Sequence, residues 1–129
     1  MEQQQYLIDT NVVIDYLGKK LPATAMAFLN DVIDSIPNVS IITRIEVLGF
    51  STSEDNYQLL ESFMNDATVL DLTEDVANQS IQIRKTRKTK LPDAIIAATA
   101  MIYDLALITR NIDDFKNIPN LKVVNPWEK

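Results

Sequence analysis

The chain has 129 residues, of which 47% are apolar and 23% charged, a balance typical of one compact globular domain. No apolar run approaches the roughly 18 residues of a membrane span, so we expect no membrane segment. The absence of cysteine excludes disulfides and thiolate metal sites, and the absence of histidine excludes histidine triads and imidazole zinc sites. The first residues lack the basic and apolar regions of a signal peptide, so we expect a cytoplasmic protein.

The charges are unevenly distributed along the chain. The formal net charge, −6 from 12 basic and 18 acidic residues, argues against a protein that coats nucleic acid through bulk electrostatics. Five basic residues nevertheless crowd into one short stretch just before Asp93, namely Arg84, Lys85, Arg87, Lys88 and Lys90. This basic stretch could contact nucleic-acid phosphates, or it could be the solvated end of a helix, where cations are favoured.

Short β-rich runs alternate with longer helical segments, a pattern typical of βα units around a mostly parallel sheet. We predict strands at 6–8, 39–42, 68–72, 105–108 and 121–124, the last at a sheet edge. Helices are predicted at 11–18, after Pro22, at 44–50, at 57–64, at 74–86 with Thr73 as its cap, and from Leu91 onward. The predicted fold is therefore a single α/β domain over residues 1–129, with about five central strands flanked by helices.

Four acidic residues each directly follow a short apolar run that is typical of a strand: Asp9, Glu46, Asp93 and Asp114. In a parallel α/β sheet the chain leaves every strand at the same edge, and ligands bind at that edge. Four carboxylates placed there would converge, and nearby negative charges repel unless a cation or a proton intervenes. Mg²⁺ and Mn²⁺ prefer oxygen ligands of this kind, and they can activate water for phosphodiester hydrolysis. The pattern therefore predicts a metal-dependent enzyme acting on phosphate esters, with one or two ions.

Each acid also has a structural alternative. Asp9 could cap a helix, Thr43 and Glu46 fit a capping box, and Asp93 could occupy a helix first turn, as could the acids of segment 111–114. The convergent pocket is the favoured interpretation, because an unpaired buried carboxylate is costly and metal coordination offsets that cost. Neutral oxygen donors beside the acids are predicted to support them, namely Asn11, Thr109 and Asn111.

Two other functions fit parts of the pattern. The segment DTNVV resembles the opening of the haloacid dehalogenase pattern, whose phosphatases use an aspartate nucleophile, but Asn11 stands where the acid/base aspartate is needed. A non-catalytic interaction module would predict the loss of one or more pocket acids, and all four are present.

Four segments, LIDTNVVIDYL, SIITRIEVLGF, KLPDAIIAATA and LALITRNIDDFKNI, together resemble the PIN-domain ribonucleases, and most closely the VapC toxins of prokaryotic toxin–antitoxin pairs. They come in the family's order and spacing and span nearly the whole chain. The resemblance maps the family's acids onto Asp9, Glu46, Asp93 and Asp114, with Asp113 as the neighbouring alternative for the last. It implies endoribonuclease activity on RNA, neutralisation by a cognate antitoxin, and a homodimer. Arg44 and Arg110, beside these acids, could then contact RNA phosphates.

Overall fold

The computed structural model describes residues 4–128, so residues 1–3 and 129 of the predicted domain lie outside the described residues. The strands are β1 (Tyr6–Ile8), β2 (Asn38–Ser40), β3 (Thr68–Leu70), β4 (Ala106–Ile108) and β5 (Val123–Val124). The helices are α1 (Thr10–Leu17), α2 (Ala23–Asp34), α3 (Ile41–Leu48), α4 (Glu54–Asp66), α5 (Glu74–Thr86), α6 (Leu91–Ile102) and α7 (Ile112–Phe115), followed by the 3-10 helix η1 (Pro126–Glu128). No helix among the described residues is both long and apolar enough to cross a membrane.

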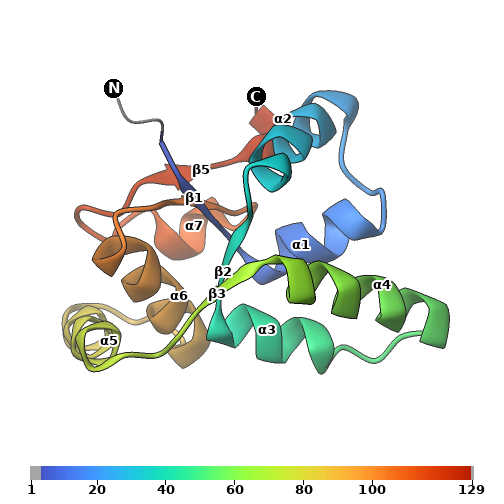
Figure 1. Ribbon diagram of the computed structural model, residues 1–129. Helices are drawn as coiled ribbons and strands as arrows, with labels where there is room; N and C mark the ends of the chain where they lie inside the picture. The colour runs from blue at the N-terminus through green and yellow to red at the C-terminus, as the bar shows by residue number, and fades with distance from the viewer. Residues whose placement is uncertain (1–3, 129) are drawn as a thin grey trace.

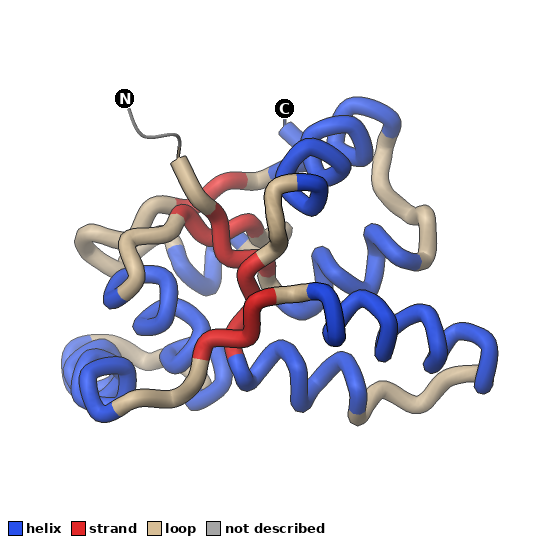
Figure 2. The backbone as a smooth tube through the Cα atoms, viewed as in Figure 1, coloured by secondary structure: helices blue, strands red, loops and turns tan. Residues whose placement is uncertain are grey.

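The five strands form one parallel sheet in the order β3-β2-β1-β4-β5. Figure 2 shows them as a narrow central layer between the helices. β1 and β4, at the centre, are paired in register from Tyr6 with Ala106 to Ile8 with Ile108. The predicted α/β architecture is confirmed, and β5 lies at an edge as expected.

Both faces of the sheet are buried because successive side chains of a strand point to opposite sides. Leu7 and Leu107 enter one apolar cluster, whereas Ile8 and Ile108 enter the other, and all four are at most 1% exposed. Helices α5, α6 and α7 lie on one side of the strands in Figure 1, and α1, α2 and α4 lie on the other. A parallel sheet covered in this way leaves its strand ends as the accessible part.

The second strand is shorter than predicted. It ends at Ser40, and the residues expected to finish it, Ile41 and Ile42, begin α3. The reason is the serine hydroxyl, which accepts a hydrogen bond from the backbone N–H of Ile42 (3.0 Å) and so caps the helix. The predicted capping box starting at Thr43 is therefore wrong, since Thr43 lies inside the helix and is fully buried.

The bounds of α5 and the start of α6 follow the sequence signals, whereas α4 (Glu54–Asp66) is longer than the predicted 57–64. Thr73 caps α5 by accepting a hydrogen bond from the N–H of Val76 (3.2 Å), and α5 covers the predicted residues 74–86. α6 begins at Leu91 with Pro92 in its first turn, and every residue from 94 to 100 is buried. Its small alanines let it pack against α5, β2 and β4.

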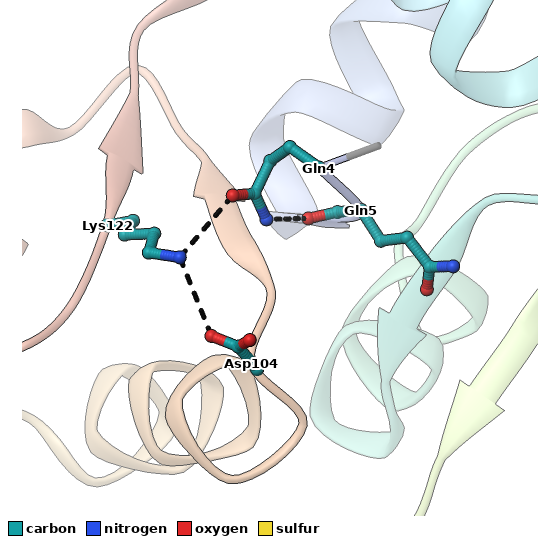
Figure 3. Close-up of polar contacts among 4 residues, drawn as sticks. All are labelled: Gln4, Gln5, Asp104 and Lys122. Atoms are coloured by element: carbon teal, nitrogen blue, oxygen red, sulfur yellow. Dashed lines mark hydrogen bonds and ion pairs between the residues drawn. The ribbon is translucent and has the colours of Figure 1, made fainter. Parts of the chain in front are cut away.

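The amino edge of the sheet carries a small polar cluster (Figure 3). Lys122, just before β5, places its Nζ 3.5 Å from Asp104 Oδ1 and donates to Gln4 Oε1 at 3.5 Å. These side chains are exposed. An acidic residue at this edge thus has a cation beside it.

Candidate active site

Asp9 and Thr109 meet at the carboxyl edge of the two central strands. Because Ile8 pairs with Ile108, the next residues of β1 and β4 lie side by side although they are 100 positions apart. The N–H of Asp9 donates to the carbonyl of Ile108 (2.9 Å), and Thr109 Oγ1 donates to Asp9 Oδ2 (2.7 Å). Asp9 is 5% exposed and Thr109 is fully buried, so this carboxylate is held firmly.

The second oxygen of Asp9 is also bound. Oδ1 accepts a hydrogen bond from the N–H of Thr10 (2.9 Å), so Asp9 caps α1 while it faces the strand edge. Burial raises its pKa, the hydrogen bonds from Thr109 and Thr10 lower it, and the negative charges of Glu46 and Asp114 raise it further. The net shift is upward, which shows that capping alone does not offset the burial of this charge.

Glu46, on α3, contacts Thr10, the residue that follows Asp9. It lies on the second turn of α3 and is exposed, and its Oε1 accepts a hydrogen bond from Thr10 Oγ1 (2.7 Å). Thr10 Oγ1 also lies 3.0 Å from Thr43 Oγ1 in the buried contact between α1 and α3. Sequence reasoning missed Thr10, since a residue 36 positions from Glu46 gives no local sign of this contact.

Asp93 lies in the first turn of α6 and is partly buried. Its pKa is raised to about 6, chiefly by burial and then by the negative charges of Asp9 and Asp114. Lys90 lowers this pKa and Glu46 raises it slightly. All four predicted acids therefore share one electrostatic environment, in which repulsion outweighs the nearby lysine.

Asp114 and Asp113 are adjacent in α7 and both are exposed. Asp113 forms an ion pair with Lys116 (Oδ1–Nζ 3.0 Å), whereas Asp114 is the one whose charge raises the pKa of Asp93. They line a polar pocket of about 560 Å³ together with Arg110, Asn111, Ile112, Asn125 and Glu128. The electrostatics favour Asp114 over Asp113 as the fourth acid.

The three predicted supporting residues differ in their contacts. The Thr109 hydroxyl both donates to Asp9 and accepts from the N–H of Asn111 (3.0 Å). Asn111 thus acts through its backbone, and its side chain is exposed. Asn11 is exposed on α1, and among the described residues its side chain forms no hydrogen bond with any of the four acids.

The basic stretch is only partly near the acids. Lys90 is close enough to Asp93 to lower its pKa. Arg84 and Lys85, near the end of α5, instead line an apolar groove of about 520 Å³ between α5 and α6. Arg84 and Lys85 occupy the last turn of α5, where cations are favoured, and their contact with RNA stays a prediction.

The other predicted RNA contacts lie at or near the surface. Lys88, Arg44 and Arg110 are exposed, and Arg87 is partly buried. The guanidinium of Arg110 stacks over the Trp127 ring, 4.8 Å from its centroid, at the pocket that contains Asp114. Arg110 is thus held beside a candidate catalytic acid.

The donors of this site suit a hard divalent cation. Within residues 4–128 no three acidic side chains are already grouped to hold one ion. Mg²⁺, however, is usually bound by one or two carboxylates, with waters and substrate phosphates as its remaining ligands. The ion pairs in this part of the chain involve Asp113 and Asp104, so the four candidate acids lack the salt-bridge partner that would neutralise them. Oxygen donors with uncompensated charge fit such an ion.

Comparison with known proteins identifies the family. The sequence model of the PIN domain matches residues 6–121, so the chain belongs to the PIN-domain family. It is 30% identical over 122 residues to Ribonuclease VapC19 from Mycobacterium tuberculosis, covering 90% of this chain and 96% of that protein. The family resemblance predicted from the sequence is confirmed.

Solved structures give the same fold. A toxin–antitoxin complex from Klebsiella pneumoniae contains a chain 33% identical to this one, with a TM-score of 0.75 and coverage of 95% and 98% of the two chains. DNA-bound VapBC from Salmonella typhimurium contains a chain 26% identical, with a TM-score of 0.81 and coverage of 96% and 99%.

Proposed function

We propose that this protein is a PIN-domain endoribonuclease that hydrolyses RNA phosphodiester bonds with Mg²⁺ or Mn²⁺ at Asp9, Glu46, Asp93 and Asp114. The observation that carries the proposal is the electrostatic coupling of these four acids at the carboxyl edge of the sheet, without a salt bridge to any of them among the described residues. A relative named as a ribonuclease covers nearly all of this chain.

In this proposal the four acids have different roles in metal binding, which follow from their burial and hydrogen bonds. Asp9, fixed by Thr109 and by the N–H of Thr10, and Asp93, whose pKa is raised to about 6, are the principal metal ligands. Glu46 and Asp114 are more exposed and hold water molecules or complete the coordination. A bound divalent ion would supply an activated attacking water and stabilise the charge on the leaving oxygen.

The RNA would approach across the exposed cations around the acids. Lys90, Arg44 and Arg110 lie nearest to candidate acids in space or in sequence and are the preferred phosphate contacts. Arg84 and Lys85, in the last turn of α5, and Arg87 and Lys88, directly after it, are proposed as further RNA contacts. Such contacts would provide sequence-independent affinity, while the acids would hold the metal ion that activates the attacking water.

The biological role proposed with this activity is that of a toxin in a toxin–antitoxin pair. Structural relatives are described as toxin–antitoxin complexes, which supports a cognate antitoxin as partner. The homodimer and the cytoplasmic location expected from the sequence belong to the same proposal. Sedimentation of the purified protein tests the dimer, and growth arrest on expression, absent for Asp93→Asn, tests the toxin role.

The nuclease activity itself is tested with purified protein, total RNA and transfer RNA. Reactions contain Mg²⁺, Mn²⁺ or excess EDTA, and the Asp93→Asn variant is purified in parallel. We expect discrete cleavage that requires metal and is lost in the variant by about 100-fold or more, because metal ions contribute several kcal/mol to such reactions. Equal cleavage by the variant would assign the activity to a contaminant and remove the proposal's support.

A further inference from the structure

The hydroxyls of Thr10 and Thr43 form a directional chain that ends on Glu46. Thr10 Oγ1 lies 2.7 Å from Glu46 Oε1 and 3.0 Å from Thr43 Oγ1. A hydroxyl has one hydrogen to donate, and a carboxylate can only accept. Thr10 must therefore donate to Glu46, and it must accept from Thr43, which is fully buried.

Thr10 also contacts a second carboxylate of the site, that of Asp9. Its backbone N–H donates to Asp9 Oδ1 at 2.9 Å, so a single residue holds one acid through its main chain and another through its side chain. Thr10 is 8% exposed, and its bond to Asp9 is buried, whereas its bond to the exposed Glu46 is only partly buried. The two acids come from different elements, the end of β1 and the second turn of α3, and Thr10 links them directly.

The place of Thr10 in its helix explains why its hydroxyl is available. A threonine inside a helix usually donates to the carbonyl of the preceding turn, as Thr99 does to Ile95 O (2.7 Å) in α6. Thr10 is the first residue of α1 and has no preceding helical turn. Its hydroxyl is thus free to reach across to α3, with Thr43 fixing its direction.

We propose that Thr10 is a positioning residue that sets the spacing between Asp9 and Glu46 before a divalent cation binds, with Thr43 holding the Thr10 hydroxyl in its donating orientation. This inference rests on the proposed function in that it takes both acids as metal ligands. Glu46 is a long, exposed side chain, and a charge-assisted hydrogen bond restricts its rotamers in advance. Restriction before binding lowers the entropic cost of coordination.

The test measures Mn²⁺ binding to the whole chain by calorimetry, without RNA, for wild type and four variants. Thr10→Val removes the hydroxyl at nearly constant shape, and we expect Mn²⁺ affinity to fall about 10- to 100-fold, the range for residues that orient metal ligands. Thr10→Ser should restore the affinity to within roughly threefold of wild type. Thr43→Val should lower Mn²⁺ affinity only a few-fold, because the Thr10 hydroxyl can still donate to Glu46.

Thr99→Val is the matched control, since it deletes a buried threonine hydroxyl that contacts only its own helix. It should bind Mn²⁺ as wild type does. The inference is wrong if Thr10→Val binds Mn²⁺ normally, if Thr10→Ser is as weak as Thr10→Val, if Thr99→Val is equally impaired, or if the wild type binds no Mn²⁺. A wild type that binds Mn²⁺ but cuts no RNA would contradict the proposed function, and the Mn²⁺ affinities of the variants would still test the role of Thr10.

Discussion

The two edges of the sheet treat their acidic residues differently. At the amino edge the side chain of Asp104 is 90% exposed and has Lys122 beside it at 3.5 Å (Figure 3). At the carboxyl edge Asp9 is 5% exposed, and its two oxygens are held by the hydroxyl of Thr109 and the N–H of Thr10 rather than by a cation. Asp104 is thus paired with a cation at the surface, whereas Asp9 is buried without an ion pair among the described residues.

The comparison locates the unfavourable electrostatic interactions of the fold at the carboxyl edge of the sheet. An exposed ion pair such as that of Asp104 adds little to the free energy of unfolding, so its removal has little effect. At the carboxyl edge Asp93 is instead partly buried and lies near the negative charges of Asp9 and Asp114, and its pKa is raised chiefly by burial and then by these charges. Such an arrangement opposes folding unless a cation binds, which is typical of a functional site.

Asp9→Asn compared with Asp104→Asn gives the largest expected contrast. We expect Asp9→Asn to lower RNA cleavage by about 100-fold or more, because the amide cannot serve as an anionic metal ligand. Asp104→Asn should stay within about twofold of wild type, since an exposed pair is worth little. Asparagine also tolerates the positive φ of 54° at this position. Similar losses in single-turnover cleavage for both variants would contradict the contrast.

Thr109→Val probes the bond that orients Asp9. The variant leaves Asp9 Oδ2 without its 2.7 Å donor, and a hydrogen bond to a charged group is worth about 1.5–3 kcal/mol. We expect a drop of that order in the free energy of unfolding and about a 10- to 100-fold loss of cleavage. Thr99→Val serves as control, and cleavage by Thr109→Val equal to that of this control would show that Asp9 needs no orientation.

The adjacent acids of α7 should separate in effect. Asp114→Asn is expected to reduce cleavage by about tenfold, because the variant loses a carboxylate that the proposal places in the metal site beside Asp9 and Asp93. Asp113→Asn should change cleavage by no more than about twofold, since its 3.0 Å partner is the exposed Lys116. Cleavage rates at saturating Mg²⁺ decide between them, and a reversed order would assign the fourth acid to Asp113.

The raised pKa of Asp93 predicts a pH dependence of stability in the metal-free protein. We take the ordinary aspartate pKa of 3.8 for the unfolded chain, and the pKa of Asp93 in the folded protein is about 6. Between these two pH values the folded state therefore binds more protons than the unfolded state. Stability should therefore decrease as pH rises through about 6, by on the order of 1–2 kcal/mol given the partial exposure of the side chain.

Denaturant unfolding in EDTA between about pH 4 and pH 7 measures this slope. Asp93→Asn should flatten it and should be more stable than wild type at neutral pH, even though it is expected to lose activity. Saturating Mg²⁺ should have a similar stabilising effect on wild type. An unchanged slope in the variant would mean that the pH dependence comes from other groups.

Sequence patterns anticipated the sheet because parallel strands buried on both faces leave short apolar runs, and caps such as Thr73 mark helix starts. They failed at Ser40, where an apolar run continued from a strand into a helix and only the serine cap marked the boundary. The strand-end rule described Asp9 correctly, but Asp93 opens α6 directly after helix α5 with no strand between them, and Glu46 lies on the second turn of α3. The link from Thr10 to Glu46 could not be predicted, because it depends on how α1 packs against α3 and not on any local pattern.

The central claim is that the acids at the carboxyl edge share a divalent cation. Anomalous diffraction from crystals grown with Mn²⁺, for wild type and for Asp93→Asn, tests it most directly. We predict a manganese peak in contact with carboxylate oxygens of Asp9 and Asp93 in wild type, and loss or displacement of that peak in the variant. Manganese bound elsewhere, with Asp9 and Asp93 contacted only by protein groups, would contradict the account.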